Sequence, residues 1–464
     1  MKSCLFIGIF TLLVCSCGKP EPVVQADVGG IWDGGLVVAG TTLEISVQLS
    51  QTDSTLAGKI EIPVQNVRGL ELIGIDVRGD SVFFSIPSGL GRADFLGTVR
   101  GDSMSGAFVQ SGYTGSYTLL RTSRDIPLSV STGEEVVIRG DDCELAGTLD
   151  LPQGEPPYPC VFLLTGSGQQ DRDEYVMGFP VFAVLSRHLT DAGLAVLRCD
   201  DRGVGGSTGG MEAFNDSVLL YEANLMLDFL RQDGRIDPSR IGVLGHSEGS
   251  STAFALAAGR PSDIAFVVSM AGPALDGYTT ILAQQAAILR TQGFPEEEIV
   301  RRQAVQTGIM DAVLAGADST ELESILDRQF RSEFAGLTEE ELAMMGDVEG
   351  QIRMMVDQAL AQVTSEWFES FLVNDPAINI RSVTCPVLVL SGGKDIQVPR
   401  DLNLPHMESA LEDNPDHETV VFDDANHLFQ QSVTGAVEEY ATLEPAFIEG
   451  FPEAVTGWIS ERVF

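Results

Sequence analysis

One serine stands in a setting that could make it a nucleophile. Ser247 is the centre of the segment 245–249 (GHSEG), which fits the pattern G-x-S-x-G. The apolar run 241–244 comes directly before this segment, and the helix-forming run 253–258 follows it. A serine at a sharp turn from strand to helix presents its hydroxyl outward, and the helix N-terminus lies close to a developing oxyanion. The spacing therefore predicts Ser247 as a nucleophile for acyl transfer.

A second serine fits the same pattern and has to be weighed against the first. Ser207 is the centre of the segment 205–209 (GGSTG). It lies in a long glycine-rich loop several residues after a predicted strand, and no helical pattern begins before Asn215. Because the pattern has meaning only at a turn from strand to helix, we favour Ser247 over Ser207.

A serine nucleophile needs a base, and one histidine stands out among the five in the chain. His427 follows the predicted strand 420–422, so it lies at the carboxyl edge of the sheet, where the turn at Ser247 also opens. His246 is adjacent to Ser247 and is expected to point away from it. The other three lie in a predicted surface helix or in polar segments before the final strand: His188, His406 and His417. His427 is therefore the predicted general base.

The base in turn needs a carboxylate to hold its tautomer. Asp395 follows the apolar run 387–390 and the segment 391–394 (SGGK), so it also lies just past a strand on the same edge. Enzymes whose nucleophilic serine lies at such a turn carry their triad in the chain order Ser, Asp, His, and the choice of Asp395 gives this order. Three other acids remain as alternatives for the same role: Asp375, Asp423 and Asp424.

The elements that must position these residues alternate between buried strands and amphipathic helices. After two strands at 136–139 and 144–149, six further runs are predicted strands: 160–164, 195–199, 241–244, 265–270, 387–390 and 420–422. Between several of them lie helical patterns: 179–190, 216–231 and 250–259. This alternation predicts a mostly parallel sheet covered on both faces by helices, built from residues 126–274 and 377–464.

A helical stretch interrupts this alternation. Residues 275–376 show no strand signal and contain acidic amphipathic patterns such as 295–315 and 338–371. An insertion of this length between two strands is expected to form a cap over the carboxyl edge of the sheet, where ligands bind in such folds. Its methionines could line an apolar substrate pocket or simply form the core of the cap.

The region before the sheet has a different pattern. Residues 29–122 contain short alternating runs such as 43–47, 81–85 and 98–102, separated by Gly and Asp turns. They predict a small antiparallel β-sandwich or barrel. It contains no His or Cys, so we expect it to serve as a packing module or to shape the substrate site. The alternative is that it contains a ligand-binding groove.

The first seventeen residues have the pattern of an export signal. Lys2 is followed by eleven apolar residues, 4–14, too few to span a bilayer. The end of this segment, 13–17 (LVCSC), resembles the bacterial lipobox, which implies that Cys17 becomes a diacylated N-terminus. The alternative is an ordinary signal peptide cut nearby. We expect an exported protein, anchored by lipid on the periplasmic or cell-surface side of a bacterial membrane, with residues 18–28 as a tether.

The charge of the chain excludes one class of partner. The formal net charge is −39, and only four of the basic residues are lysines. Such a surface repels phosphate, so nucleic acid is not an expected partner. An acidic, lysine-poor surface is also typical of proteins in concentrated salt, but a merely soluble acidic protein would look the same. The four cysteines beyond Cys17 show neither a disulfide framework nor metal-ligand spacing, so we expect no metal: Cys143, Cys160, Cys199 and Cys385.

From about Val136 to Phe464 the chain resembles the α/β-hydrolase superfamily, particularly its bacterial esterase and serine-aminopeptidase-like branch. The segment 163–168 (LLTGSG) resembles the oxyanion loop, although Thr165 stands where many members have His. By position, the resemblance implies an oxyanion hole formed by the backbone N–H groups of Ser167 and Glu248. The segment 200–207 (DDRGVGGS) resembles the D-x-R-G-x-G-x-S loop of the family, which makes Ser207 a turn residue.

Two further segments are similar to an esterase subgroup that carries an N-terminal β-domain: 168–174 and 367–371 with Asp375-Pro376. The resemblance implies hydrolysis of carboxylic esters through an acyl-enzyme, without a cofactor. One alternative is an exopeptidase on short peptides, in which acids such as those of 296–298 would hold the substrate ammonium. Another is a non-catalytic surface lipoprotein that binds lipid or glycan through its β-domain.

Overall fold

The structure, a computed structural model, describes residues 26–38, 41–52, 55–62, 67–88, 91–110, 113–122, 133–210, 214–335, 338, 342 and 347–464. The predicted export signal, Cys17 and the predicted tether as far as residue 25 lie outside the described residues. The chain divides between Arg124 and Asp125 into two compact units, each described below by itself.

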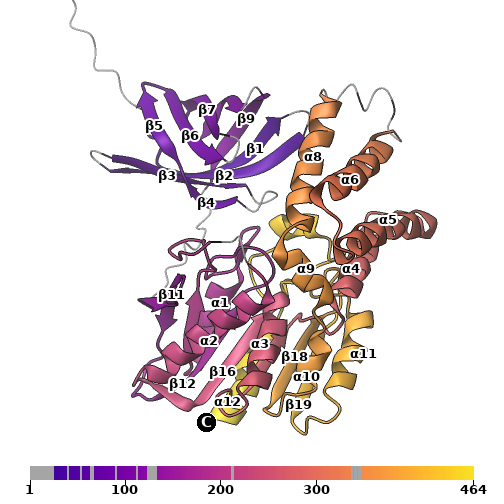
Figure 1. Cartoon of the computed structure of the whole chain (residues 1–464). Helices are drawn as coiled ribbons and strands as arrows, with labels where there is room; N and C mark the ends of the chain where they lie inside the picture. The colour runs from indigo at the N-terminus through magenta and orange to yellow at the C-terminus, as the bar shows by residue number, and fades with distance from the viewer. Residues whose placement is uncertain are drawn as a thin grey trace, which may run out of the picture. The chain divides into compact units, whose positions relative to one another are not determined.

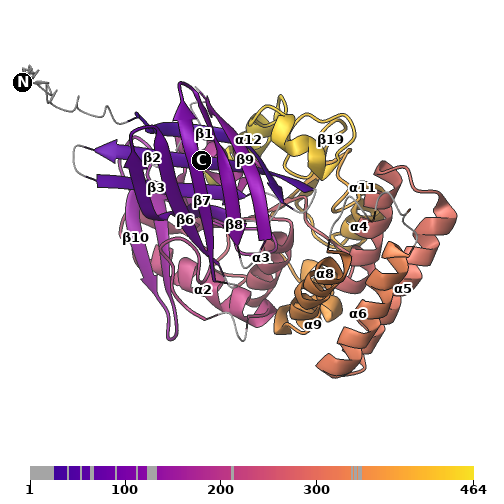
Figure 2. The ribbon, with the colours of Figure 1, turned by 90° about the horizontal axis from the view of Figure 1, so that it is seen from above.

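The first unit is one antiparallel sheet of nine strands (Figure 2). Its strands are β1 Gly30–Val38, β2 Thr41–Thr52, β3 Thr55–Ile62, β4 Val67–Glu71, β5 Ile73–Arg78, β6 Ser81–Ser88, β7 Gly91–Arg100, β8 Ser103–Gln110 and β9 Tyr113–Thr122. β4 and β5 are the two edges of the sheet, yet only Leu72 separates them in the chain. The sheet must therefore curve round until its edges approach, so the structure favours the barrel over the sandwich.

Aromatic side chains fill the inside of this curved sheet. Trp32, Phe84, Phe95 and Tyr117 are all buried, and the rings of Phe84 and Phe95 stack with centroids 4.8 Å apart. One predicted strand is too long: 98–102 is not all strand, because β7 ends at Arg100 and Gly101, at a φ of 60°, begins the turn into β8. A positive φ suits glycine and breaks the strand there.

The second unit is built on an eight-stranded sheet in the order β10-β11-β15-β12-β16-β17-β18-β19 (Figure 1). These strands are β10 Glu134–Arg139, β11 Glu144–Asp150, β12 Tyr158–Leu164, β15 Ala195–Cys199, β16 Ile236–His246, β17 Val267–Met270, β18 Val387–Gly392 and β19 His417–Phe422. β13 Tyr175–Val176 and β14 Phe179–Pro180 form a separate short hairpin. The pairs β10–β11 and β11–β15 are antiparallel and the other five pairs are parallel, so the predicted, mostly parallel sheet is confirmed. His417, expected before the final strand, begins it.

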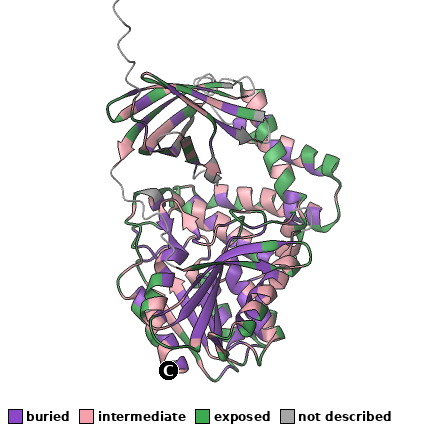
Figure 3. Ribbon diagram, turned by 90° about the vertical axis from the view of Figure 1, so that its left-hand side faces the viewer, coloured by how far each residue is buried: buried purple, intermediate pink, exposed green. Residues whose placement is uncertain are grey.

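Helices cover both faces of this sheet, as predicted. The helices are α1 Val181–Asp191, α2 Asp216–Gln232, α3 Glu248–Gly259, α10 Pro376–Ile380, α11 Arg400–Ala410 and α12 Phe451–Val463, with a 3-10 helix at Val437–Thr442. Val161 and Leu163 of β12 pack with α1 and α12, whereas Phe162 packs with α2 and α3 on the other face. Alternate side chains of a strand point to opposite faces, which explains why the runs are apolar throughout. Figure 3 shows the strands of this sheet as mostly buried.

Between β17 and β18 the chain forms a helical insertion. It contains α4 Gly277–Thr291, α5 Glu296–Leu314, α6 Ser319–Phe334, α8 Val348–Val363 and α9 Glu366–Val373. The single helix predicted for 338–371 is wrong, because the chain breaks between α8 and α9, where the hydroxyl of Ser365 accepts a hydrogen bond from the N–H of Phe368 and caps α9. Within the described ranges, no helix is both long and apolar enough to span a membrane.

Candidate active site

Ser247 lies at the sharp turn from β16 into α3. Its backbone has φ 52° and ψ −121°, a conformation that residues other than glycine rarely adopt. The two flanking glycines let the strand and the helix meet closely, since a Cβ on Gly245 would lie 2.1 Å from the carbonyl oxygen of Gly249. The predicted turn from strand to helix is therefore present, and it holds Ser247 at the carboxyl edge of the sheet.

His427 and Asp395 meet at the same edge. The Nδ1 of His427 lies 2.8 Å from Oδ2 of Asp395, and both side chains are buried. The other carboxylate oxygen of Asp395, Oδ1, accepts hydrogen bonds from the N–H groups of Gln397 at 2.8 Å and Val398 at 2.9 Å. Because Nδ1 faces the carboxylate, Nε2 is the nitrogen left for proton transfer.

His246 contacts His427 and is the neighbour of Ser247 in the chain. The rings of His246 and His427 pack with centroids 4.7 Å apart, and His246 directly precedes Ser247 in the chain. In the part of the chain that the structure describes, no hydrogen bond joins Ser247 to His427. Catalytic hydrogen bonds in unliganded enzymes are often long and tighten only when substrate binds.

The rival candidates have other contacts. The buried hydroxyl of Ser207 donates to the carbonyl of Asp200 at 2.7 Å and accepts from the N–H of Ala146 at 2.8 Å, so it serves a turn. Asp375 caps α10, and Asp423 is exposed and pairs with Arg400. Asp424 is also exposed, as are His188 and His406. His417 faces the carbonyl of Asn414.

The loop after β12 is held by two acids, Glu174, which is buried, and Asp201, which is partly buried. Thr165 donates to Asp201 at 2.7 Å, and the N–H of Gly166 donates to Oε1 of Glu174 at 2.7 Å. Burial raises the pKa of Asp201 well above its ordinary value, although the hydrogen bonds from Thr165 and the N–H of Gln170 lower it. Among the described residues, the N–H groups of Ser167 and Glu248 donate to no protein acceptor, so both are available to an oxyanion.

Two contacts around the site were not expected from the sequence. His246 is buried, and its Nδ1 lies 2.8 Å from Oε1 of Glu174. Trp367 of α9 donates from Nε1 to Oε1 of Glu248 at 2.7 Å. Burial raises the pKa of Glu248 to about 7, against a lowering by the Trp367 hydrogen bond. The resemblance of the segments 168–174 and 367–371 to an esterase subgroup is the one signal in the sequence that points to these contacts.

Comparison with known proteins identifies the fold family. A family profile described as alpha/beta hydrolase fold matches residues 161–431, more than half of the chain. The chain belongs to the α/β-hydrolase family. This α/β-hydrolase is 26% identical over 289 residues to Esterase EstD of Thermotoga maritima, a match that covers 61% of this chain and 58% of that esterase. The chain thus spans less than two thirds of the length of this relative.

Two solved structures are similar to part of this chain. An esterase of Pyrococcus furiosus matches with a TM-score of 0.43 and 16% identity, covering 74% of this α/β-hydrolase and 94% of that chain. A proline iminopeptidase of Mycobacterium smegmatis matches with a TM-score of 0.43 and 17% identity, covering 71% and 98% of the two chains.

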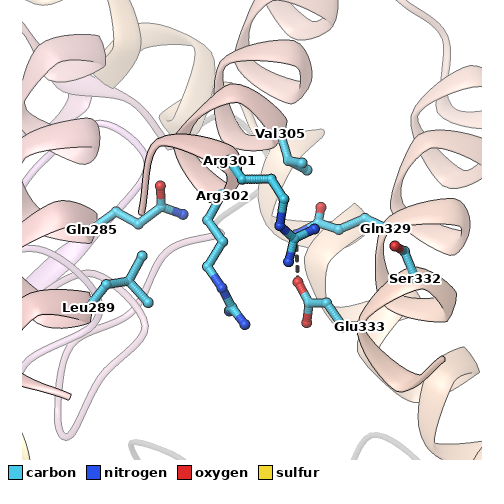
Figure 4. A pocket seen from close by; sticks show the side chains of 8 residues that line it. All are labelled: Gln285, Leu289, Arg301, Arg302, Val305, Gln329, Ser332 and Glu333. Carbon is cyan, nitrogen blue, oxygen red and sulfur yellow. Dashed lines mark hydrogen bonds between the residues drawn. The ribbon is translucent and has the colours of Figure 1, made fainter. Parts of the chain in front are cut away.

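Two cavities in this α/β-hydrolase lie near the site and in the helical insertion. One of about 180 Å³ runs along α3 and is lined by residues that include Asp216, Glu248, Ser251, Thr252 and Asn379. The other, of about 80 Å³, lies among α4, α5 and α6 (Figure 4) and is lined by Gln285, Leu289, Arg301, Arg302, Val305, Gln329, Ser332 and Glu333. The four cysteines from Cys143 onward are free thiols. In the described part of the chain, no group of three or more His, Cys, Asp or Glu could hold a metal ion.

Proposed function

We propose that this α/β-hydrolase cleaves carboxylic esters, with Ser247 as nucleophile, His427 as general base and Asp395 as the residue that orients it. The observation that carries the proposal is the meeting of two features at one sheet edge: the strained turn at Ser247 and the buried His427–Asp395 pair. The identity to an esterase supports the substrate class.

The reaction would proceed in two steps through an acyl-enzyme. His427 accepts the proton of Ser247 through Nε2 as Oγ attacks the acyl carbonyl, and the N–H groups of Ser167 and Glu248 bind the oxyanion. The protonated His427 then donates its proton to the leaving alkoxide. Water, deprotonated by the same His427, attacks the acyl-enzyme, and His427 returns the proton to Oγ of Ser247 as the acid leaves. Asp395 stays ionised and stabilises the imidazolium at each stage.

We propose further that the helical insertion α4–α9 is a cap on this site. α9 supports this idea because it bonds to the first turns of two core helices. Trp367 bonds to Glu248 of α3, and Ser370 donates to Asp216 of α2 at 3.2 Å. Trp367 and Ser370 are three residues apart and so lie on one face of α9. Through this face the insertion contacts the residue next to the nucleophile.

Nothing in the site favours the peptidase alternative. Two of the three acids of its suggested ammonium clamp, 296–298, are engaged within the insertion: Glu296 pairs with Arg290, and Glu298 pairs with Arg301 and Arg302. Glu297 is exposed. No contact in the described β-unit favours lipid or glycan binding as the main function either. Esters are therefore the substrates to test first.

The deciding experiment is hydrolysis of p-nitrophenyl esters from acetate to laurate by the purified chain, by Ser247→Ala and by Ser262→Ala. Ser262 is exposed in a turn and serves as the matched control. We expect turnover by the wild type and Ser262→Ala and its loss in Ser247→Ala. Full activity of Ser247→Ala would contradict the assigned nucleophile. If no ester reacts, aminoacyl-naphthylamides become the next substrates, and their cleavage would replace the esterase proposal with the peptidase one.

We also propose that the protein is exported and lipid-anchored through Cys17. The basis is the lipobox-like segment 13–17 after an apolar run. Growth of expressing bacteria with radiolabelled palmitate should label the wild type and leave Cys17→Ser unlabelled. Export of an unlabelled wild-type chain would point instead to an ordinary signal peptide.

A further inference from the structure

His246 lies at the point where three parts of the site meet. It is 3% exposed, its Nδ1 is 2.8 Å from Oε1 of Glu174 and its Nε2 is 3.1 Å from the carbonyl oxygen of His427. Glu174, itself 1% exposed, also accepts the N–H of Gly166 at 2.7 Å. One histidine and one glutamate thus bond to the loop after β12 and to the loop after β19.

The acceptors around the ring favour one protonation state. A neutral imidazole has one N–H, but both nitrogens of His246 face oxygen acceptors: a carboxylate on one side and a backbone carbonyl on the other. The carbonyl cannot donate, so Nε2 must carry a proton. Oε1 of Glu174 already accepts from Gly166, and a proton on Nδ1 gives it a second donor. An imidazolium facing a carboxylate supplies a donor for each of these acceptors.

The charges around His246 agree with this state. Burial by itself would lower the pKa of His246, but Glu174, the His427 carbonyl and the charge of Asp395 raise it above its ordinary value. The ring of His427 packs against it, and Asp201 lies near enough to Glu174 to interact electrostatically. The second oxygen of Glu174, Oε2, is buried and has no hydrogen-bond partner among the described residues. Within the described part of the chain, all hydrogen bonds of the Glu174 carboxylate therefore involve Oε1.

His246 and Glu174 lie next to the groups proposed to react, so a change in either can affect catalysis. Gly166 precedes Ser167, the proposed oxyanion donor, and His246 precedes Ser247. The spacing between the two segments is tight, because a Cβ on Gly166 would lie 3.3 Å from Cβ of Ser247 and 3.2 Å from Oε1 of Glu174. A change in the pair would therefore shift the nucleophile, the oxyanion loop and the base relative to one another.

We propose that His246 and Glu174 form a buried ion pair that positions His427, Ser247 and the oxyanion loop for the reaction, without itself touching substrate. This inference rests on the proposed ester hydrolysis. It assigns two positioning residues to that reaction, and it predicts an alkaline limit to activity. Deprotonation of His246 at high pH removes one of its two N–H donors. Either the carbonyl of His427 or the carboxylate of Glu174 then loses its hydrogen bond from His246.

The kinetic test compares Glu174→Gln and His246→Gln with the control His188→Gln, whose histidine is exposed on α1. Each of the two site variants should lower kcat on the order of 10²-fold, as small misplacements of reacting groups do, with little change in KM. The wild type should lose kcat at alkaline pH, whereas His246→Gln should lack that limb. Wild-type kcat in both site variants would overturn the proposal. The double variant Glu174→Gln/His246→Gln keeps neutral hydrogen-bonding groups and covers the case in which a single variant does not fold.

A second measurement does not depend on turnover. The full chain labelled with ¹⁵N-histidine contains five histidines, and His246→Gln identifies the signals of one of them. At pH 7 both ring nitrogens of His246 should resonate as protonated nitrogens in the wild type. A neutral His246 at that pH would overturn the ion pair even if the protein is an active esterase. The opposite result is a charged His246 in a protein that hydrolyses no ester and does not react with a fluorophosphonate. That result would contradict the proposed function and would support the ion pair.

Discussion

Asp395 uses its two carboxylate oxygens for different purposes. Oδ1 accepts two backbone N–H groups, which fix the side chain, and Oδ2 faces Nδ1 of His427. The fixed carboxylate thus determines which nitrogen of His427 carries the proton. This division suggests a substitution that keeps the fold and removes the charge.

Asp395→Asn should keep the hydrogen bonds to Oδ1 but present an amide to Nδ1, which favours the wrong tautomer of His427. We expect kcat for a p-nitrophenyl ester to fall about 10⁴-fold at pH 7, with an unchanged circular dichroism spectrum. Asp424→Asn is the matched control, because Asp424 is exposed in the loop before His427. A loss of less than tenfold in Asp395→Asn would argue for another carboxylate partner.

Glu248 gives a second effect at the residue scale, on stability. Its pKa is raised to about 7 by burial, so the folded protein prefers the neutral acid. Stability from this group is fully present below its unfolded pKa and is lost as the pH rises through the folded value. A shift from about 4.5 to about 7 corresponds to about 3 kcal/mol, lost mainly between those pH values.

Glu248→Gln should therefore flatten the pH dependence of unfolding between pH 5 and 8. The measurement is the denaturation midpoint of the second unit within the full chain, in urea at pH 5 and pH 8, for the wild type, Glu248→Gln and Glu369→Gln. Glu369 is exposed on α9 and serves as the control. The same pH dependence in all three proteins would show that Glu248 titrates normally.

At the scale of elements, the site depends on how closely β16, α3 and β12 approach. Gly249 lies in the first turn of α3, and a Cβ there would be 2.3 Å from the carbonyl oxygen of Leu164 at the end of β12. Gly259 ends the same helix, and a Cβ there would meet nothing within 4 Å. The two glycines thus differ in packing and not in helix.

Gly249→Ala should push α3 away from β12. The overpacked contact should lower the free energy of unfolding by about 1–3 kcal/mol or more, and kcat should fall as well. Gly259→Ala should be neutral or stabilising by up to about 1 kcal/mol, because alanine favours a helix. Thermal unfolding and kcat of the two variants check this. Similar effects of both substitutions would mean that the close approach at Gly249 is not what restricts the position.

At the scale of the whole molecule, the main feature is the net negative charge. A formal net charge of −39 makes the folded chain repel itself in dilute buffer. The Debye length falls from about 10 Å at 0.1 M salt to about 3 Å at 1 M, which screens charges across the surface but hardly affects the buried His427–Asp395 pair. The repulsion should therefore weaken with salt while the site stays intact.

We expect the thermal midpoint to rise between 0.1 M and 1 M NaCl, by about 2–4 °C for each kcal/mol of repulsion relieved. kcat for a short ester should be retained at 1 M NaCl. Differential scanning calorimetry and the ester assay at the two salt concentrations test this. A midpoint that falls with salt would show that surface ion pairs, rather than net repulsion, control stability.

The sequence by itself determined the local features of this protein. The apolar runs such as 387–390 predicted the parallel sheet, and the glycines around Ser247 predicted the turn from strand to helix. Both predictions are confirmed because one segment decides its own conformation there, and periodicity and glycine placement report local burial and backbone freedom.

Only the tertiary structure decided which distant residues meet. Glu174 and His246 are 72 positions apart, and Glu248 and Trp367 are 119 apart. The break between α8 and α9 and the closure of the nine-stranded sheet were decided at the same level. A sequence pattern shows that a side chain is buried but not what it is buried against, and the pairing of His246 with Glu174 exists only once β16 and the loop after β12 have packed together.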